Sequence, residues 1–371
     1  MRVTQPAVLV GNYDWAETLL PRAEYEARLK QVLGKLDNSL AGLVIYGNKI
    51  DNAALAYVSN FAPKIESAIA LLTKDGKLRI HAAGSPQMMV NAKRLTWVED
   101  VRPQRDAAKH VAEWAEEAAG LGPLGFWTTE AMPGDLQPRF EAALNGRKLV
   151  DVSASLNALL REKSPVALKL SGDACGVLTK AVEAMKDRFN GESGREAAVA
   201  AERAAADAGA QDARVLISLS KGGTPTAIDY PDGGKLDPLL AYVAVRYAGY
   251  WAEGFVTLTS MTHETVTRTQ AALKAVLKTA KAGATVAALR DAAQAELGGL
   301  AIHPAARQAA VGVGLMLEET EAEPDGVAKL EAGRVYSLRV GASKSPSDNA
   351  LLSAMVVPKA DGVDVLWSAL D

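Results

Sequence analysis

The pattern of apolar residues changes near residue 160, and this change constrains the fold more than any other feature of the sequence. Before residue 160, short apolar runs of strand length alternate with segments in which apolar residues recur at helical spacing. These segments lie at 19–36, 41–46, 68–72, 78–82, 110–119 and 149–152. Because such alternation is typical of α/β folds, we predict an α/β domain over residues 1–152.

After the change, helices and strands come in blocks. Helical patterns cover 166–189, 194–208, 267–281 and 286–297, and strand-like runs cover 241–247, 254–259, 334–340 and 351–357. Blocks of this kind are typical of α+β folds. We therefore predict an α+β domain over residues 160–371. The boundary should lie between Val152 and Pro165, where Lys163-Ser164-Pro165 breaks the chain before a helix.

Composition narrows the classes of function. The chain has 371 residues, which favours two domains, and a formal net charge of −3, which gives no basic field for nucleic acid. No apolar run of about 18 residues is present, so no membrane span is expected. The segment Met1 to Gly11 carries one arginine and a short apolar stretch broken by Pro6, and it does not read as a signal peptide.

Cysteine and histidine usage bears on metal and redox chemistry. Cys175 is the only cysteine, which excludes a disulfide within the chain and a thiolate-rich zinc site, and which fits a cytoplasmic location. The four histidines are His81, His110, His263 and His303. None stands three or four residues from another, so no helical metal-binding pair exists. We expect each to be a surface histidine or a core histidine with its hydrogen bonds satisfied.

Five short motifs in the second half occur in the order and rough spacing of one known family. Residues 330–341, LEAGRVYSLRVG, are similar to L-x-P-G-M-V-F-T-V-E-P-G, and 310–319, AVGVGLMLEE, to G-H-G-I-G-L-x-x-H-E. Residues 247–253, YAGYWAE, are similar to Y-x-G-Y-x-x-D, and 282–285, AGAT, to P-G-x-T. Residues 161–165, REKSP, are one residue short of R-x-x-K-S-P.

Through these motifs the chain resembles the creatinase, aminopeptidase P and prolidase family. The resemblance implies a pita-bread domain over residues 160–371, preceded by the smaller α/β domain, and usually a homodimer. The metalloenzymes of the family hold two divalent ions through two aspartates, one histidine and two glutamates. Oxygen ligands and an imidazole of this kind suit Mn or Zn.

The family's ligand positions are carried over here one at a time. The first aspartate falls on Tyr242 and the second on Glu253, while the histidine falls on Val311. The first glutamate falls on Arg339 and the second on Ser353. Only Glu253 keeps a carboxylate, and an arginine inside the site would repel cations. We therefore expect no bound metal and no cofactor.

Two readings of the function remain open, and a third has less support. In the first, the chain is a binding or partner subunit, which could pair with a related active chain. In the second, it is a metal-independent hydrolase or lyase of a small amide, guanidino or carboxylate compound, as creatinase shows that the fold can act without metal. In the third, it is an active metallopeptidase whose ligands have moved.

An enzyme would need groups that transfer protons and groups that bind substrate. The candidate acids and bases are Glu253, Glu318 at the position of a family histidine, and Asp229, which could instead be a turn residue. Arg339 would anchor a carboxylate or peptide-like ligand. The other candidate binding residues are Tyr242, Tyr250 and Glu319.

The vacated metal site leads to a structural prediction. A lone Glu253 would be a buried charge, which is costly unless it is paired. We expect the Arg339 guanidinium to occupy the former metal volume and pair with Glu253, with Glu318 or Glu319 nearby. The Tyr242 ring should fill the remaining space with its hydroxyl satisfied by a polar neighbour. The alternative is that these side chains point into solvent.

Overall fold

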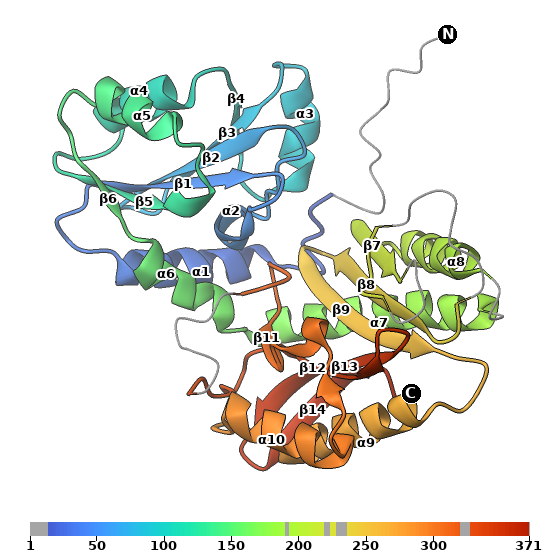
Figure 1. Cartoon of the computed structure of the whole chain (residues 1–371). Coiled ribbons are helices and arrows are strands. Elements are labelled where there is room, and N and C mark those ends of the chain that lie inside the picture. The colour runs from blue at the N-terminus through green and yellow to red at the C-terminus, as the bar shows by residue number, and fades with distance from the viewer. Residues whose placement is uncertain (1–13, 190–192, 219–222, 228–235, 320–326, 371) are drawn as a thin grey trace, which may run out of the picture. The chain divides into compact units, whose positions relative to one another are not determined.

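A computed structural model of the chain describes residues 14–189, 193–218, 223–227, 236–319 and 327–370. These residues form two compact units, one ending at Glu162 and the other beginning at Lys163. Each unit has its own sheets and its own helices (Figure 1). In the described residues, no helix is long and apolar enough to cross a membrane.

The first unit is built on a mixed six-stranded sheet in the order β4-β3-β2-β1-β5-β6. The central strand β1 (Gly42–Asn48) runs antiparallel to β2 (Ser67–Thr73) and parallel to β5 (Leu124–Trp127). The remaining strands are β3 (Leu78–Ala83), β4 (Asp100–Gln104) and β6 (Leu149–Asp151). The central strand is buried along most of its length, as its continuous apolar run predicts.

Helices cover both faces of this sheet (Figure 1). Helix α4 (Ala107–Glu117) and helix α5 (Leu136–Ala143) pack together over one face, where Trp114, Phe126 and Phe140 lie in one apolar cluster. The other helices are α1 (Arg22–Lys35), α2 (Ala53–Ser59), α3 (Met88–Ala92) and α6 (Ser153–Arg161). The predicted α/β class of this unit is confirmed.

The segment around the predicted boundary contains a helix that the sequence analysis did not identify. Helix α6 buries Leu156, Leu159 and Leu160, which stand at the i, i+3, i+4 spacing of one helix face. The helix has only nine residues, and so short an apolar pattern is easily read as a linker. Strands β4 and β5 were missed for the same reason.

The second unit contains two antiparallel sheets. The three-stranded sheet has the order β7 (Asp212–Ile217), β8 (Leu239–Tyr247), β9 (Tyr250–Leu258). The larger sheet contains β10 (Ala301–Ile302), β12 (Tyr336–Ser345), β13 (Asp348–Lys359) and β14 (Gly362–Ser368), with β11 (Ala310–Gly312) also paired to β12. The Phe255 N–H of β9 donates to Ser353 Oγ of β13 at 2.8 Å, so the two sheets meet along these strands.

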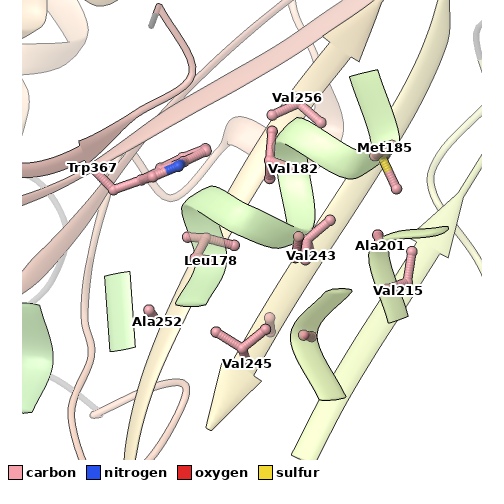
Figure 2. Packing of buried hydrophobic residues seen from close by; sticks show 14 of the residues in the cluster. Leu178, Val182, Met185, Ala201, Val215, Val243, Val245, Ala252, Val256 and Trp367 are labelled. Carbon is pink, nitrogen blue, oxygen red and sulfur yellow. The ribbon is translucent and has the colours of Figure 1, made fainter. Parts of the chain in front are cut away.

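Four long helices cover these sheets and confirm the predicted α+β class. Helices α7 (Pro165–Arg188) and α8 (Gly194–Asp207) pack on the three-stranded sheet, and α9 (Glu264–Thr279) and α10 (Val286–Leu297) lie beside the larger one (Figure 1). Ser164 caps α7 by accepting from the Ala167 N–H at 3.1 Å. Figure 2 shows Leu178, Val182 and Met185 of α7 directed at the valines of β8 and β9.

Candidate functional site

A buried ion pair joins the two sheets of the second unit at the position predicted for it. Glu253 of β9 is completely buried, and the Arg339 side chain of β12 is 7% exposed. Arg339 Nη2 and Nε both donate to Glu253 Oε1, at 2.6 and 3.0 Å. The predicted pairing of Arg339 with Glu253 is therefore confirmed, and the alternative that both side chains point into solvent is wrong.

Tyr242 completes the coordination of this carboxylate. Its hydroxyl donates to Glu253 Oε2 at 2.7 Å, as predicted for a hydroxyl with a polar neighbour. The Tyr242 ring leans against Phe255, its cross-strand partner, with ring centroids 4.9 Å apart. The Arg339 guanidinium carbon lies 5.5 Å from the centroid of the same Phe255 ring. Both oxygens of Glu253 are thus occupied by donors.

The electrostatics of the cluster keep each donor protonated. Burial and the adjacent Glu253 carboxylate raise the pKa of the Tyr242 hydroxyl far above its usual range. Burial acts to lower the pKa of Arg339, but the charge and the hydrogen bonds of Glu253 outweigh it, and the pKa of Arg339 is raised. The cluster is therefore a carboxylate held by a permanent cation and a neutral phenol.

The other two positions of the family's ligand set offer no metal ligand of the family's kind. Ser353 stands directly opposite Arg339 in the β12–β13 register, and its Oγ accepts from the backbone of β9. Val311 is buried in β11. Where two glutamates and a histidine would meet, this chain has a guanidinium, a hydroxyl and an isopropyl group.

A second buried ion pair lies beside the first and was not predicted. Lys163 Nζ donates to both Glu319 oxygens, at 2.7 and 2.9 Å, and the two side chains are 2% and 3% exposed. A Cβ atom at Gly314 would overlap the ends of both charged side chains, which would then have to shift. The Glu319 carboxylate therefore binds Lys163, and of the two residues predicted near Arg339 it is Glu318 that lies there. The ligand-binding role of Glu319 stays a prediction. The K-S-P motif was the available signal for Lys163.

The remaining predicted site residues differ in their place relative to Arg339. Glu318 Oε1 lies 3.6 Å from Arg339 Nη1, and its side chain is 60% exposed. Tyr250 is buried three residues from Glu253 on the same strand, and the alternation of side chains places it on the opposite face of β9. Asp229 lies outside the described residues.

One histidine expectation is wrong. His81 of β3 and His110 of α4 stack with ring centroids 4.4 Å apart, although 29 residues separate them in the sequence. His81 is 4% exposed, and neither of its ring nitrogens has a hydrogen-bond partner among the residues that the structure describes. It is therefore a core histidine whose nitrogens lack these hydrogen bonds. The expectation failed because contacts between a strand and a helix of different layers cannot be predicted from spacing in the sequence.

The residues present do not fit the dinuclear metal centre that the resemblance implies. In the part of the chain that the structure describes, no group of three or more histidine, cysteine, aspartate or glutamate side chains could hold a metal ion. Glu253 has both oxygens engaged, and the nearest positive charge is the fixed guanidinium of Arg339. A divalent ion beside Glu253 would have to displace this cation.

Comparisons with known proteins agree with this architecture. The X-Pro aminopeptidase from Thermotoga maritima superposes with a TM-score of 0.75 at 18% identity, over 92% of this chain and 97% of its own. The prolidase from Pyrococcus horikoshii gives 0.73 at 17% identity, over 92% and 97%. Aminopeptidase PepP from Pseudomonas aeruginosa gives 0.73 at 14% identity, over 94% and 95%.

At these identities the likeness shows the pita-bread fold and nothing about activity. No curated protein sequence matches the chain. The sequence model of metallopeptidase family M24 matches residues 169–359, which is more than half of the chain. The chain therefore belongs to metallopeptidase family M24.

Proposed function

We propose that this chain is an M24 family member that lacks the dinuclear metal centre and acts as a binding or partner subunit, not as a peptidase. One observation carries the proposal. The single carboxylate left at the family's ligand positions, Glu253, is neutralised by Arg339 and hydrogen-bonded by Tyr242. A metal ion at this carboxylate would have to displace the Arg339 guanidinium that now neutralises it.

The same contacts weigh against the alternative of a metal-independent hydrolase or lyase. A general base must reach the proton of its substrate, and Glu253 is completely buried with its charge stabilised by Arg339, which makes its carboxylate a weaker base. Glu318 is an exposed carboxylate, which water solvates freely. The geometry of the described residues therefore favours a binding role over proton transfer.

Assembly and location form part of the proposal. The resemblance to the creatinase family supports a homodimer, and a related active chain is the second partner to test. Light scattering at micromolar concentration that gave the mass of one chain would remove the homodimer. Cys175 is the only cysteine, and this sparse use of cysteine supports a cytoplasmic location. The thiol is buried, and burial raises its pKa to about 12, which keeps it unreactive.

A peptidase assay tests the proposed function. The purified chain is incubated with Xaa-Pro dipeptides and with longer peptides that have proline in second position, in EDTA or with added Mn²⁺, Co²⁺ or Zn²⁺. We expect no release of the first residue above the buffer background in any condition. Metal-dependent release that disappears in a Glu253→Gln variant would show that Glu253 serves a working metal centre, and it would overturn the proposal.

A further inference from the structure

The Arg339 guanidinium is bound on one side only. Its Nε and Nη2 donate to Glu253. Nη1 makes no hydrogen bond to any residue that the structure describes. It is also not completely buried, unlike the unpaired side-chain atoms in the interior of that part of the chain. Nη1 therefore retains some contact with solvent, and the guanidinium, which Glu253 holds in place, has one edge that is not hydrogen-bonded.

Glu318 is the only acidic group at this free edge among the described residues, and it is loosely placed. Its Oε1 lies 3.6 Å from Nη1, which is beyond hydrogen-bond distance, and its side chain is 60% exposed. The backbone beside it is fixed, because Glu319 pairs with Gly312 and its side chain binds Lys163. Rotation of one side chain would therefore release the edge without moving the main chain.

We propose that the Nη1 edge of Arg339 binds the carboxylate of a small monocarboxylic ligand, and that Glu318 occupies this position as an internal stand-in. This inference deepens the proposed binding role and rests on it. A guanidinium edge matches a carboxylate in shape and charge. The Phe255 ring lies beside the Arg339 guanidinium, and the Tyr242 ring contacts Phe255, so aromatic side chains adjoin the proposed site.

The charge of the cluster selects a single negative charge. Glu253 already neutralises Arg339, so the site has no excess positive charge to hold a dianion. A monocarboxylate that replaces the Glu318 carboxylate leaves the local charge unchanged. A phosphate dianion that replaced the Glu318 carboxylate in the same way would add one more negative charge beside Glu253, which like-charge repulsion disfavours.

Titrations with defined ligands test the inference. Acetate is titrated against the full chain in EDTA, and the resonance of the Arg339 Nε–H is followed by NMR. We expect weak binding to the natural sequence and tighter binding to a Glu318→Gln variant. Because an exposed pair of this kind favours the closed form only slightly, removing it should lower the apparent Kd about two- to six-fold.

A second set of ligands distinguishes the two sources of a carboxylate. Acetyl-dialanine with a free carboxylate is compared with its C-terminal amide and with acetate. Equal affinity for the dipeptide and acetate assigns the site to small free acids, and a clear preference for the dipeptide acid over both acetate and the amide assigns it to a peptide C-terminus. Equal binding of the amide and the acid would contradict a carboxylate site.

Two further results would overturn the inference, and a third would contradict its charge argument. One is that acetate does not bind detectably, or that its Kd is the same for the Glu318→Gln variant as for the natural sequence. The other is binding that survives in an Arg339→Met, Glu253→Gln double variant, whose folding is checked by circular dichroism. Phosphate binding tighter than acetate would also contradict the charge argument. Because all titrations contain EDTA, metal-dependent peptidase activity would overturn the proposed function separately.

Discussion

The Arg339–Glu253 pair as a whole should contribute little to stability, whereas the loss of either partner alone should be costly. Taking both charges out of water costs free energy that their attraction largely offsets, so the pair as a whole contributes little to net stability. Removing one partner is different, because the other charge stays buried without compensation. The Tyr242 hydroxyl adds a hydrogen bond to the charged form of Glu253 and strengthens this dependence.

A double-mutant cycle measures this asymmetry. Arg339→Met alone should lower the free energy of unfolding by roughly 3–5 kcal/mol, because it leaves Glu253 buried and unpaired. Glu253→Gln alone should also be costly, since it leaves the guanidinium without its counter-ion, and the double variant should cost much less than either. Urea unfolding gives all three values.

An exposed ion pair in the same unit serves as the control. Arg268 Nε lies 3.0 Å from Glu264 Oε1, and these side chains are 41% and 52% exposed. Arg268→Met should change the free energy of unfolding by no more than about 1 kcal/mol. Additive losses in the Arg339 and Glu253 variants would show that the two side chains do not stabilise one another.

His81 gives the first unit a specific dependence on pH. Burial, together with His110, Arg79 and Arg102, lowers the pKa of His81 to about 4, with Asp100 opposing weakly. In the unfolded chain its pKa is about 6.5. The unfolded state therefore binds more protons between these values, so stability is complete above pH 6.5 and is lost as the pH falls toward 4.

Between pH 7.5 and pH 5 this group should remove roughly 2 kcal/mol of the free energy of unfolding. The comparison is with His81→Phe, which keeps a ring on His110 and cannot titrate. The slope of unfolding free energy against pH should be shallower in this variant, whatever its stability at neutral pH. Parallel slopes for the two proteins would mean that His81 is already protonated or is solvated in the native state.

At the scale of elements, close packing of β9 against β14 depends on a glycine. The ring of Trp367 covers Gly254, and a Cβ atom there would lie 2.7 Å from Trp367 Cζ3 (Figure 2 shows the Trp367 ring in this cluster). Gly254→Ala should therefore destabilise the second unit by about 1–3 kcal/mol through overpacking. Thermal unfolding of the variant checks this expectation.

A glycine-to-alanine substitution at another position should raise the stability instead of lowering it. Gly176 lies in α7, is exposed, and has open space where a Cβ atom would be. Gly176→Ala should stabilise the chain by about 0.5–1 kcal/mol, because alanine has the higher helix propensity. Destabilisation at both positions would show that packing space does not decide the outcome.

The apolar pattern predicted the long buried strands and missed strands that have few residues or few buried positions. β1, β8 and β12 have long apolar runs, and they were predicted within a few residues of their observed bounds. β7 and β14 were missed because each buries only two positions, so neither has the apolar pattern of a strand. A strand with so few buried residues has no apolar pattern that stands out from its surroundings.

The candidate site was predictable only where the family's motifs fixed the register. The Arg339–Glu253 pair followed from two motif positions that lie on facing strands. The Lys163–Glu319 pair joins residues 156 positions apart, and no sequence pattern connects them. The Glu319 backbone pairs with Gly312, and its side chain is directed at Lys163. The spacing of residues in the sequence does not determine this direction.

At the scale of the whole molecule, the second unit has an internal cation where its family would place metal ions. The two sheets meet at β9 and β13, and Arg339 and Ser353 provide polar contacts across this junction. Stability should therefore be independent of metal. We expect the thermal midpoint of the chain to be the same after dialysis against EDTA as before, and a loss on chelation would indicate a structural ion.

Metal content tests the central claim most directly. The chain is incubated with excess Mn²⁺, Co²⁺ or Zn²⁺, passed through a desalting column and measured by elemental analysis. Because Arg339 holds the carboxylate that a metal would need, we predict no stoichiometric metal in the natural sequence. Retention of one or more ions per chain, lost in Glu253→Gln, would contradict the account.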